Sequence, residues 1–76
     1  MSKTKKLRTL IKQAKMGKPK AMYELGIRYQ LGREVTADMT EAAEWISRAA
    51  SCGYAPAVEW TEDYYFDDDA GVQSNS

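Results

Sequence analysis

The chain contains no histidine, only one cysteine and no long apolar run. Without histidine there is no imidazole base or imidazole metal ligand, and neither a Cys–His nor a Ser–His pair can form. The run from Asp67 to Asp69 lacks the spaced ligands of a calcium loop, and Gly17-Lys18 lacks the spacing of a phosphate-binding loop. We therefore expect no catalytic site, no metal site and no cofactor.

The scarcity of cysteine and of apolar runs also bears on location. Cys52 has no second cysteine with which to form an internal disulfide, which favours a reducing compartment. No apolar run approaches the roughly 18 residues of a membrane span, and no signal-peptide core follows the basic N-terminus. We expect a cytoplasmic protein that does not contact membranes.

Charge is balanced in number but not in position. Residues 1–33 hold ten Lys or Arg and one acid, whereas residues 34–76 hold ten acids and one base. Such a dipole suits nucleic acid or an anionic membrane at the basic end, a basic protein at the acidic end, or head-to-tail self-association. It is equally compatible with plain solvation of exposed faces. An alternative nucleic-acid-binding function would use a basic face formed by Lys5, Arg8, Lys12 and Lys15, through phosphate contacts because no aromatic residue interleaves them.

Apolar residues recur at helical spacing in four segments, which predicts helices over residues 4–16, 19–31, 38–52 and 56–66. Gly17 and Gly53 are expected to end the first and third helices, and Pro19 and Pro56 suit the first turns of the second and fourth. Asp38 and Glu41 predict a capping box at the third helix. The expected core positions are Leu7, Leu10, Ile11 and Ala14; Ala21, Met22, Leu25, Gly26 and Tyr29; Ala42, Trp45, Ile46, Ala49 and Ala50; and Ala57, Val58, Thr61 and Tyr65.

The chain also repeats itself. A shift of 36 residues aligns Leu10 with Ile46, Ala14 with Ala50, Gly17 with Gly53, Ala21 with Ala57 and Tyr29 with Tyr65. Periods of this size are typical of helix-pair solenoids, in which each unit buries its apolar face against its neighbours.

The segment from Ala21 to Ala57 resembles one complete Sel1-like repeat, a relative of the tetratricopeptide repeat, with partial repeats on both sides. The residues that match the family pattern are Ala21, Leu25, Gly26, Tyr29, Gly32, Val35, Asp38, Ala42, Trp45, Arg48, Ala49, Ala50, Gly53 and Ala57. The resemblance implies an all-α fold of four short antiparallel helices, forming a minimal right-handed αα-solenoid over residues 1–66. Residues 67–76 are predicted to be an acidic, disordered tail. The implied function is a non-catalytic protein–protein interaction module, such as a small adaptor, regulator or inhibitor.

Two departures from the family pattern affect these expectations. Glu34 stands where the family has a second loop glycine, so the loop must reach its turn differently. Thr61 and Glu62 replace a leucine and a glycine in the last helix, which suggests a terminal cap, because terminal repeats of solenoids are atypical. Gly26, by contrast, is kept inside a helix, where it costs about 1 kcal/mol relative to Ala, and this favours close approach of a neighbouring helix.

The resemblance also implies where a partner binds, on the concave face lined by the first helix of each pair. Rotation by 100° per residue predicts a groove made by Lys20, Tyr23, Ile27, Gln30, Leu31, Glu59, Asp63 and Phe66. Its apolar floor and flanking carboxylates would suit a segment with apolar and basic residues, although Tyr23, Ile27 and Leu31 could equally be scattered surface residues or pack on the first helix. Trp60 and Tyr64 form a second exposed face for a partner or another copy. We expect a protein partner, and a monomer or weak homodimer.

Overall fold

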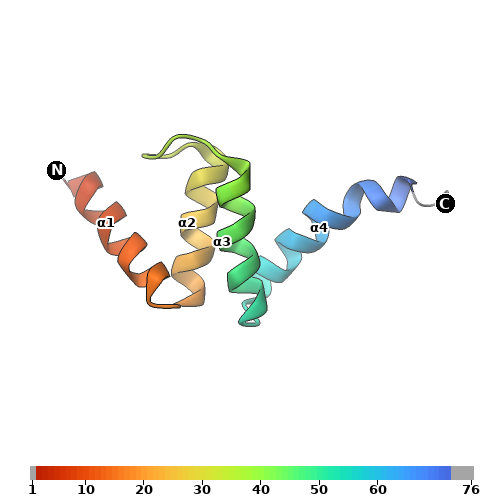
Figure 1. The fold of residues 1–76 in the computed structure, drawn as a ribbon, viewed down its shortest axis with the longest axis horizontal. Coiled ribbons are helices and arrows are strands. Elements are labelled where there is room, and N and C mark those ends of the chain that lie inside the picture. The colour runs from red at the N-terminus through yellow and green to blue at the C-terminus, as the bar shows by residue number, and fades with distance from the viewer. Residues whose placement is uncertain (1, 73–76) are drawn as a thin grey trace.

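The computed structural model describes residues 2–72, and within them the chain forms four helices and no strand (Figure 1). The helices are α1 (Ser2–Lys15), α2 (Pro19–Leu31), α3 (Met39–Ser51) and α4 (Ala55–Val72). Successive helices run in opposite directions and pack mainly on their neighbours in the chain, with α2 and α3 at the centre (Figure 1). The predicted all-α fold of four antiparallel helices is confirmed.

Three of the predicted helices agree with the structure to within two residues at each end. The agreement follows from local stop and start signals, because Gly17 and Gly53 adopt φ angles of +88° and +86° directly after α1 and α3. These two glycines are 36 residues apart, so the backbone repeats with the sequence.

The predicted end of the fourth helix near Phe66 is wrong, because α4 continues to Val72. An acidic run at a helix C-terminus costs only about 0.3–1 kcal/mol per charge, which is too little to end a helix that meets no Pro or Gly before Gly71. The division into a domain at 1–66 and a tail at 67–76 stays a prediction, and residues 73–76 lie outside the described part of the chain.

The core lies between α2 and α3. Leu25 and Ile46 are its largest fully buried side chains, and alanines surround them. A Cβ atom at Gly26 would overlap the Ile46 side chain and lie 2.9 Å from the carbonyl oxygen of Ala42. The predicted close approach of a neighbouring helix at Gly26 is therefore confirmed.

The outer helices add fewer residues to this core. Leu10 and Ala14 of α1 and Ala57 of α4 are buried. The prediction that Tyr65 faces the core is wrong, since its side chain is 49% exposed. α4 diverges from α3 along its length (Figure 1), so Tyr65, well beyond its first turns, does not reach the core. Trp60 packs against the core instead.

The loop between α2 and α3 is held by three interactions. Glu34 adopts a φ of +65°, the conformation that the missing family glycine would have supplied, and its carboxylate pairs with Arg28. The backbone N–H of Asp38 donates to the Tyr29 carbonyl at 2.9 Å. The Asp38 carboxylate accepts from the N–H groups of Thr40 at 3.0 Å and Glu41 at 3.2 Å. The predicted N-cap is confirmed, but the Asp38 N–H goes to Tyr29 and not to the Glu41 side chain, so the reciprocal half of the capping box is wrong.

The molecule is elongated, with principal extents of 50 × 24 × 14 Å. Its radius of gyration of 13.8 Å exceeds the value of about 11 Å for a compact domain of this length. The two termini lie at opposite ends (Figure 1), with α1 forming one end and α4 the other.

Candidate partner-binding face

The face of α2 that turns away from α3 meets α4 through one long-range hydrogen bond. The indole Nε1–H of Trp60 donates to the side-chain Oε1 of Gln30 at 2.9 Å. The rest of the Trp60 indole packs against the core, so the apolar part of the ring is partly buried while its N–H group makes a hydrogen bond. This contact joins the first helices of two successive repeats.

An aromatic cluster continues from this contact along α4. The rings of Trp60 and Tyr64 stack with centroids 4.7 Å apart, and Tyr65 meets Tyr64 edge-on at 4.9 Å. A hollow of about 280 Å³ beside the stack is lined by Gln30, Trp60, Asp63 and Tyr64. Tyr64 is 45% exposed, so the hollow has an accessible aromatic wall and a carboxylate at its edge. We call these four residues the α2–α4 hollow.

Tyr23 and Ile27 lie further back on the same face of α2. Both are half-buried and pack against the core, and the Tyr23 ring meets Tyr54 at 5.5 Å in a tilted arrangement. They also line a second hollow of about 430 Å³ with Glu24, Arg28 and Arg33. Tyr23 and Ile27 are therefore not isolated surface side chains.

The remaining residues of the predicted groove are less closely associated. Leu31 is 56% exposed, and Glu59 and Lys20 are exposed. Lys20 lies on the side toward α1, beside Gln13 and Glu24. The side chain of Phe66 lies outside the described residues. The groove as a binding site stays a prediction.

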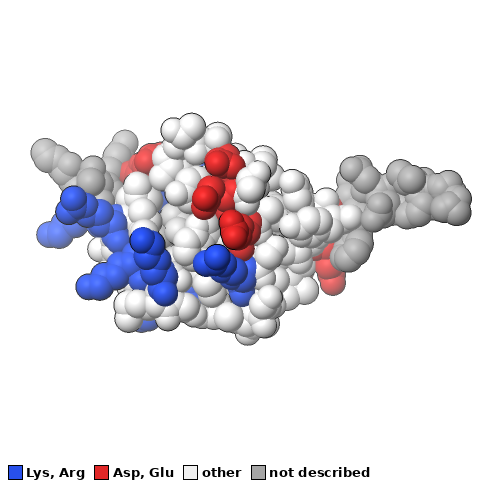
Figure 2. Space-filling view, in the orientation of Figure 1, with Lys and Arg blue, Asp and Glu red and all other residues white. Residues whose placement is uncertain are grey.

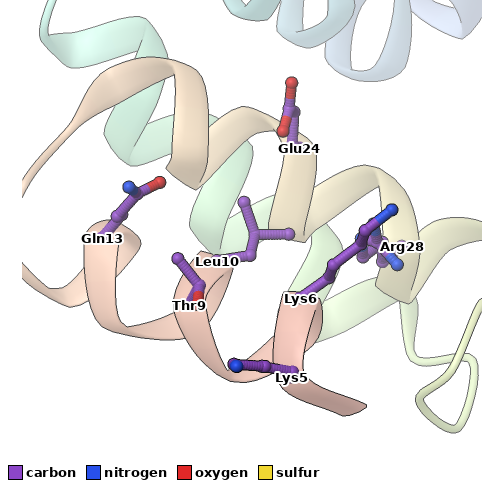
Figure 3. Close-up of a pocket in the computed structure, with 7 residues that line it drawn as sticks. All are labelled: Lys5, Lys6, Thr9, Leu10, Gln13, Glu24 and Arg28. Atoms are coloured by element: carbon purple, nitrogen blue, oxygen red, sulfur yellow. The ribbon is translucent and has the colours of Figure 1, made fainter. Parts of the chain in front are cut away.

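Two predicted sites merge in the structure. Trp60 and Tyr64, expected as a separate face, share the α2–α4 hollow with Gln30 and Asp63 of the predicted groove. The chain also has features that the sequence reasoning missed: the Tyr54 contact, the Arg28–Glu34 pair, and a groove between α1 and α2 (Figure 3). Under the 36-residue shift, Glu24 aligns with Trp60 and Arg28 aligns with Tyr64. Because Trp60 and Tyr64 line the α2–α4 hollow, this alignment could have predicted the groove between α1 and α2.

The predicted basic face lies on α1. The side chains of Lys5, Arg8, Lys12 and Lys15 are exposed, and Lys and Arg gather over the α1 end of the molecule in Figure 2. Its sequence places no aromatic residue among them. A nucleic-acid role for this face stays a prediction.

Among the side chains that the structure describes, those of residues 5–65, no group of three or more His, Cys, Asp or Glu could hold a metal ion. Cys52 is exposed at the end of α3. None of the helices in the described part of the chain is long and apolar enough to cross a membrane.

A central helix pair flanked on each side by one further helix, with backbone and sequence repeating at 36 residues, defines an α-helical repeat protein. Residues 19–54 match the Sel1 repeat family. This match confirms, over these residues, the resemblance to a Sel1 repeat seen in the sequence. Sel1 repeats generally mediate protein–protein interactions.

One similar curated protein is the secretory immunoglobulin A-binding protein EsiB of Escherichia coli, which is 49% identical over 43 residues. The match covers 57% of this chain but only 9% of EsiB, so the chain spans a small fraction of that relative. The comparison with solved structures gave no match.

Proposed function

We propose that this protein is a non-catalytic interaction module, an adaptor or regulator, that binds a protein partner through the α2–α4 hollow. The observation that carries the proposal is the accessible Trp60–Tyr64 stack, fixed in place by the hydrogen bond from Trp60 to Gln30. Stacked aromatics with a restrained geometry lose little conformational entropy on binding, and Tyr and Trp are enriched among the residues that dominate interface energy.

The chemistry of the hollow favours a particular kind of segment. Tyr64 offers an apolar wall and Asp63 a carboxylate at the edge of the hollow, and the α4 sequence contains further acidic residues. The α4 sequence carries no Lys or Arg to offset them. A partner segment with an apolar anchor next to Lys or Arg would complement both features.

The family relationship supports the same class of function. EsiB is described by its ability to bind immunoglobulin A, a protein ligand, and it shares the repeat with this chain. The identity of a ligand does not carry over from a match of this length, so the partner is specified here by chemistry alone.

The experiment is an affinity capture of the tagged chain from its native lysate with and without nuclease, followed by calorimetry with the purified captured protein. Tyr64→Ala and Asp63→Lys are each expected to weaken binding at least about tenfold, a loss of about 1.4 kcal/mol. Met39→Ala is the matched control, because Met39 is an exposed apolar residue at the start of α3, away from the hollow.

Two results would contradict the proposal. Tyr64→Ala and Asp63→Lys could bind the partner as wild type does, which would remove the hollow from the interface. Alternatively, capture could vanish with nuclease while reversal of Lys12 and Lys15 abolishes binding, which would make the basic face of α1 the site and nucleic acid the ligand.

A further inference from the structure

The groove between α1 and α2 has a volume of about 520 Å³ (Figure 3). Leu10 lies between the two helices, and polar side chains surround it in Figure 3. The lining residues are Lys5, Lys6, Thr9, Leu10 and Gln13 of α1 and Glu24 and Arg28 of α2. Lys5, Lys6 and Arg28, the last of which also pairs with Glu34, outnumber the one acid in the lining, so the groove is cationic with an apolar base.

The packing of α2 against α3 and α4 shows which element occupies the equivalent position elsewhere in the molecule. There, α2 lies on α3, with Gly26 against the Ile46 side chain and the Ala42 carbonyl. It also reaches α4, where Gln30 accepts the hydrogen bond from Trp60. A helix that is first in its pair is thus seated between the two helices that follow it.

The 36-residue shift relates the two places. Where α2 packs on α3 and α4, it is contacted by Ala42, Ile46 and Trp60. The residues 36 positions earlier are Lys6, Leu10 and Glu24, and these line the groove. By the same shift, α1 corresponds to α3, the second helix of a pair. The groove is therefore the equivalent binding site for the first helix of the pair to which α1 belongs. No helix within residues 2–72 covers it.

The fourth helix corresponds to the first helix of a pair, and no second helix follows it within residues 2–72. Val58, Glu62 and Tyr65 of α4 correspond to Met22, Gly26 and Tyr29 of α2, a stripe in which Gly26 meets α3. Glu62 is exposed, Tyr65 is 49% exposed and Val58 is half-buried. The part of this stripe at Glu62 and Tyr65 is left open by the other described helices.

The charges of the two end helices are opposite. The sequence of α1 contains six Lys or Arg and no acid, and that of α4 contains six Asp or Glu and no base. Lys6 and Glu62 occupy the equivalents of Ala42 and Gly26, which touch in the α2–α3 pair. An α4 helix seated in the groove would therefore bring Glu62 to Lys6.

We propose that copies of this chain associate head to tail, with α4 of one copy seated in the α1–α2 groove of the next. Each contact completes one helix pair across the interface. The interface uses a different side of α4 from the α2–α4 hollow, which it adjoins where Tyr65 meets Tyr64, and it does not depend on the proposed partner.

Two properties follow from this geometry. Gly26 allows α2 and α3 to touch, whereas Glu62 and Lys6 need more room, so the intermolecular pair is wider and its affinity depends more on charge. The contact joins different surfaces of identical chains, so each copy has one groove and one α4 to offer. Such heterologous contacts extend beyond a dimer.

Sedimentation velocity of the purified 76-residue chain tests the proposal. Between about 10 µM and about 1 mM, where weak interfaces dissociate, the weight-average mass is expected to rise past that of a dimer. Raising the salt concentration from about 0.05 M to about 0.5 M is expected to reverse the rise, because it shortens the Debye length to a few ångströms.

A charge exchange identifies the occupant. Lys6→Glu alone and Glu62→Lys alone each place like charges across the proposed contact, so each is expected to weaken association at least about tenfold. An equimolar mixture of the two variants restores opposite charges at every contact and is expected to associate as wild type does. Both positions are exposed, so the fold should persist, and circular dichroism checks that it does.

Lys12→Glu and Glu44→Lys are the matched controls, because they make the same charge changes at exposed positions outside the groove and α4. Both should associate nearly as wild type does. A mass that remains that of a monomer, or that stops at a dimer, overturns the proposal. Failure of the variant mixture to associate, or equal loss in the controls, also overturns it, since attraction would then follow net charge and not this contact.

Discussion

Trp60 and Gln30 meet at 2.9 Å across 30 residues of sequence, and this hydrogen bond ties the fourth helix to the second. The helices that it joins otherwise contact mainly their neighbours in the chain. The bond therefore links α4 directly to α2 at the α2–α4 hollow, in addition to the packing of α4 on α3.

A double-mutant cycle measures this coupling. Trp60→Phe keeps the ring but removes the donor, and Gln30→Ala removes the acceptor. We expect a coupling free energy of about 0.5–1 kcal/mol in urea unfolding, because the bond is exposed to solvent. Additive effects of the two substitutions would show that the bond does not hold α4.

Gly26→Ala tests the closest helix contact. In an open helix the change would stabilise by about 1 kcal/mol through helix propensity. Here the added methyl group would collide with Ile46 and the Ala42 carbonyl, so we expect unfolding free energy to fall, and Gly26→Leu to lower it by more than about 2 kcal/mol. A melting temperature at or above that of wild type for either variant would refute this placement.

Asp38→Ala tests the N-cap of α3. The carboxylate accepts hydrogen bonds from two backbone N–H groups of the first turn, so its loss should cost about 1 kcal/mol. Asp38→Asn keeps an acceptor at the same place and should remain close to wild type. Equal thermal melting of the two variants would show that the cap contributes nothing through its side chain.

Two variants at position 34 test the left-handed backbone conformation of Glu34 in the loop between α2 and α3. Both Glu34→Gly and Glu34→Ala remove the ion pair with Arg28, but only glycine adopts a φ of +65° without steric cost. We expect Glu34→Gly to be more stable than Glu34→Ala by about 1 kcal/mol in chemical unfolding. The reverse order would mean that the loop relaxes away from this conformation.

The central repeat could be predicted from sequence because its signals are local. Pro19 and Gly32 mark the ends of α2, and Gly26 indicates a close helix contact without knowledge of what approaches it. The loop could not be predicted in the same way. The Asp38 N–H pairs with Tyr29, nine residues earlier, and sequence spacing alone favoured the local partner Glu41.

The fourth helix shows where periodicity fails. Apolar residues occur on more than one side of α4, so a stripe through Tyr65 and a stripe through Trp60 were both consistent with the sequence. Which one packs depends on how α4 lies against α2 and α3, and that geometry is set by the superhelix. For the same reason, Trp60 and Tyr64 were assigned to one surface and Gln30 and Asp63 to another, although they line one hollow.

The most direct test of the binding face is site-specific photo-crosslinking with the captured partner. Two variants are made, one with a benzophenone side chain in place of Tyr64 and the other with it in place of Lys12. Both positions are exposed. The account predicts a covalent adduct with the partner from position 64 and little from position 12. An adduct from position 12 alone would contradict it and place the partner on the basic face of α1.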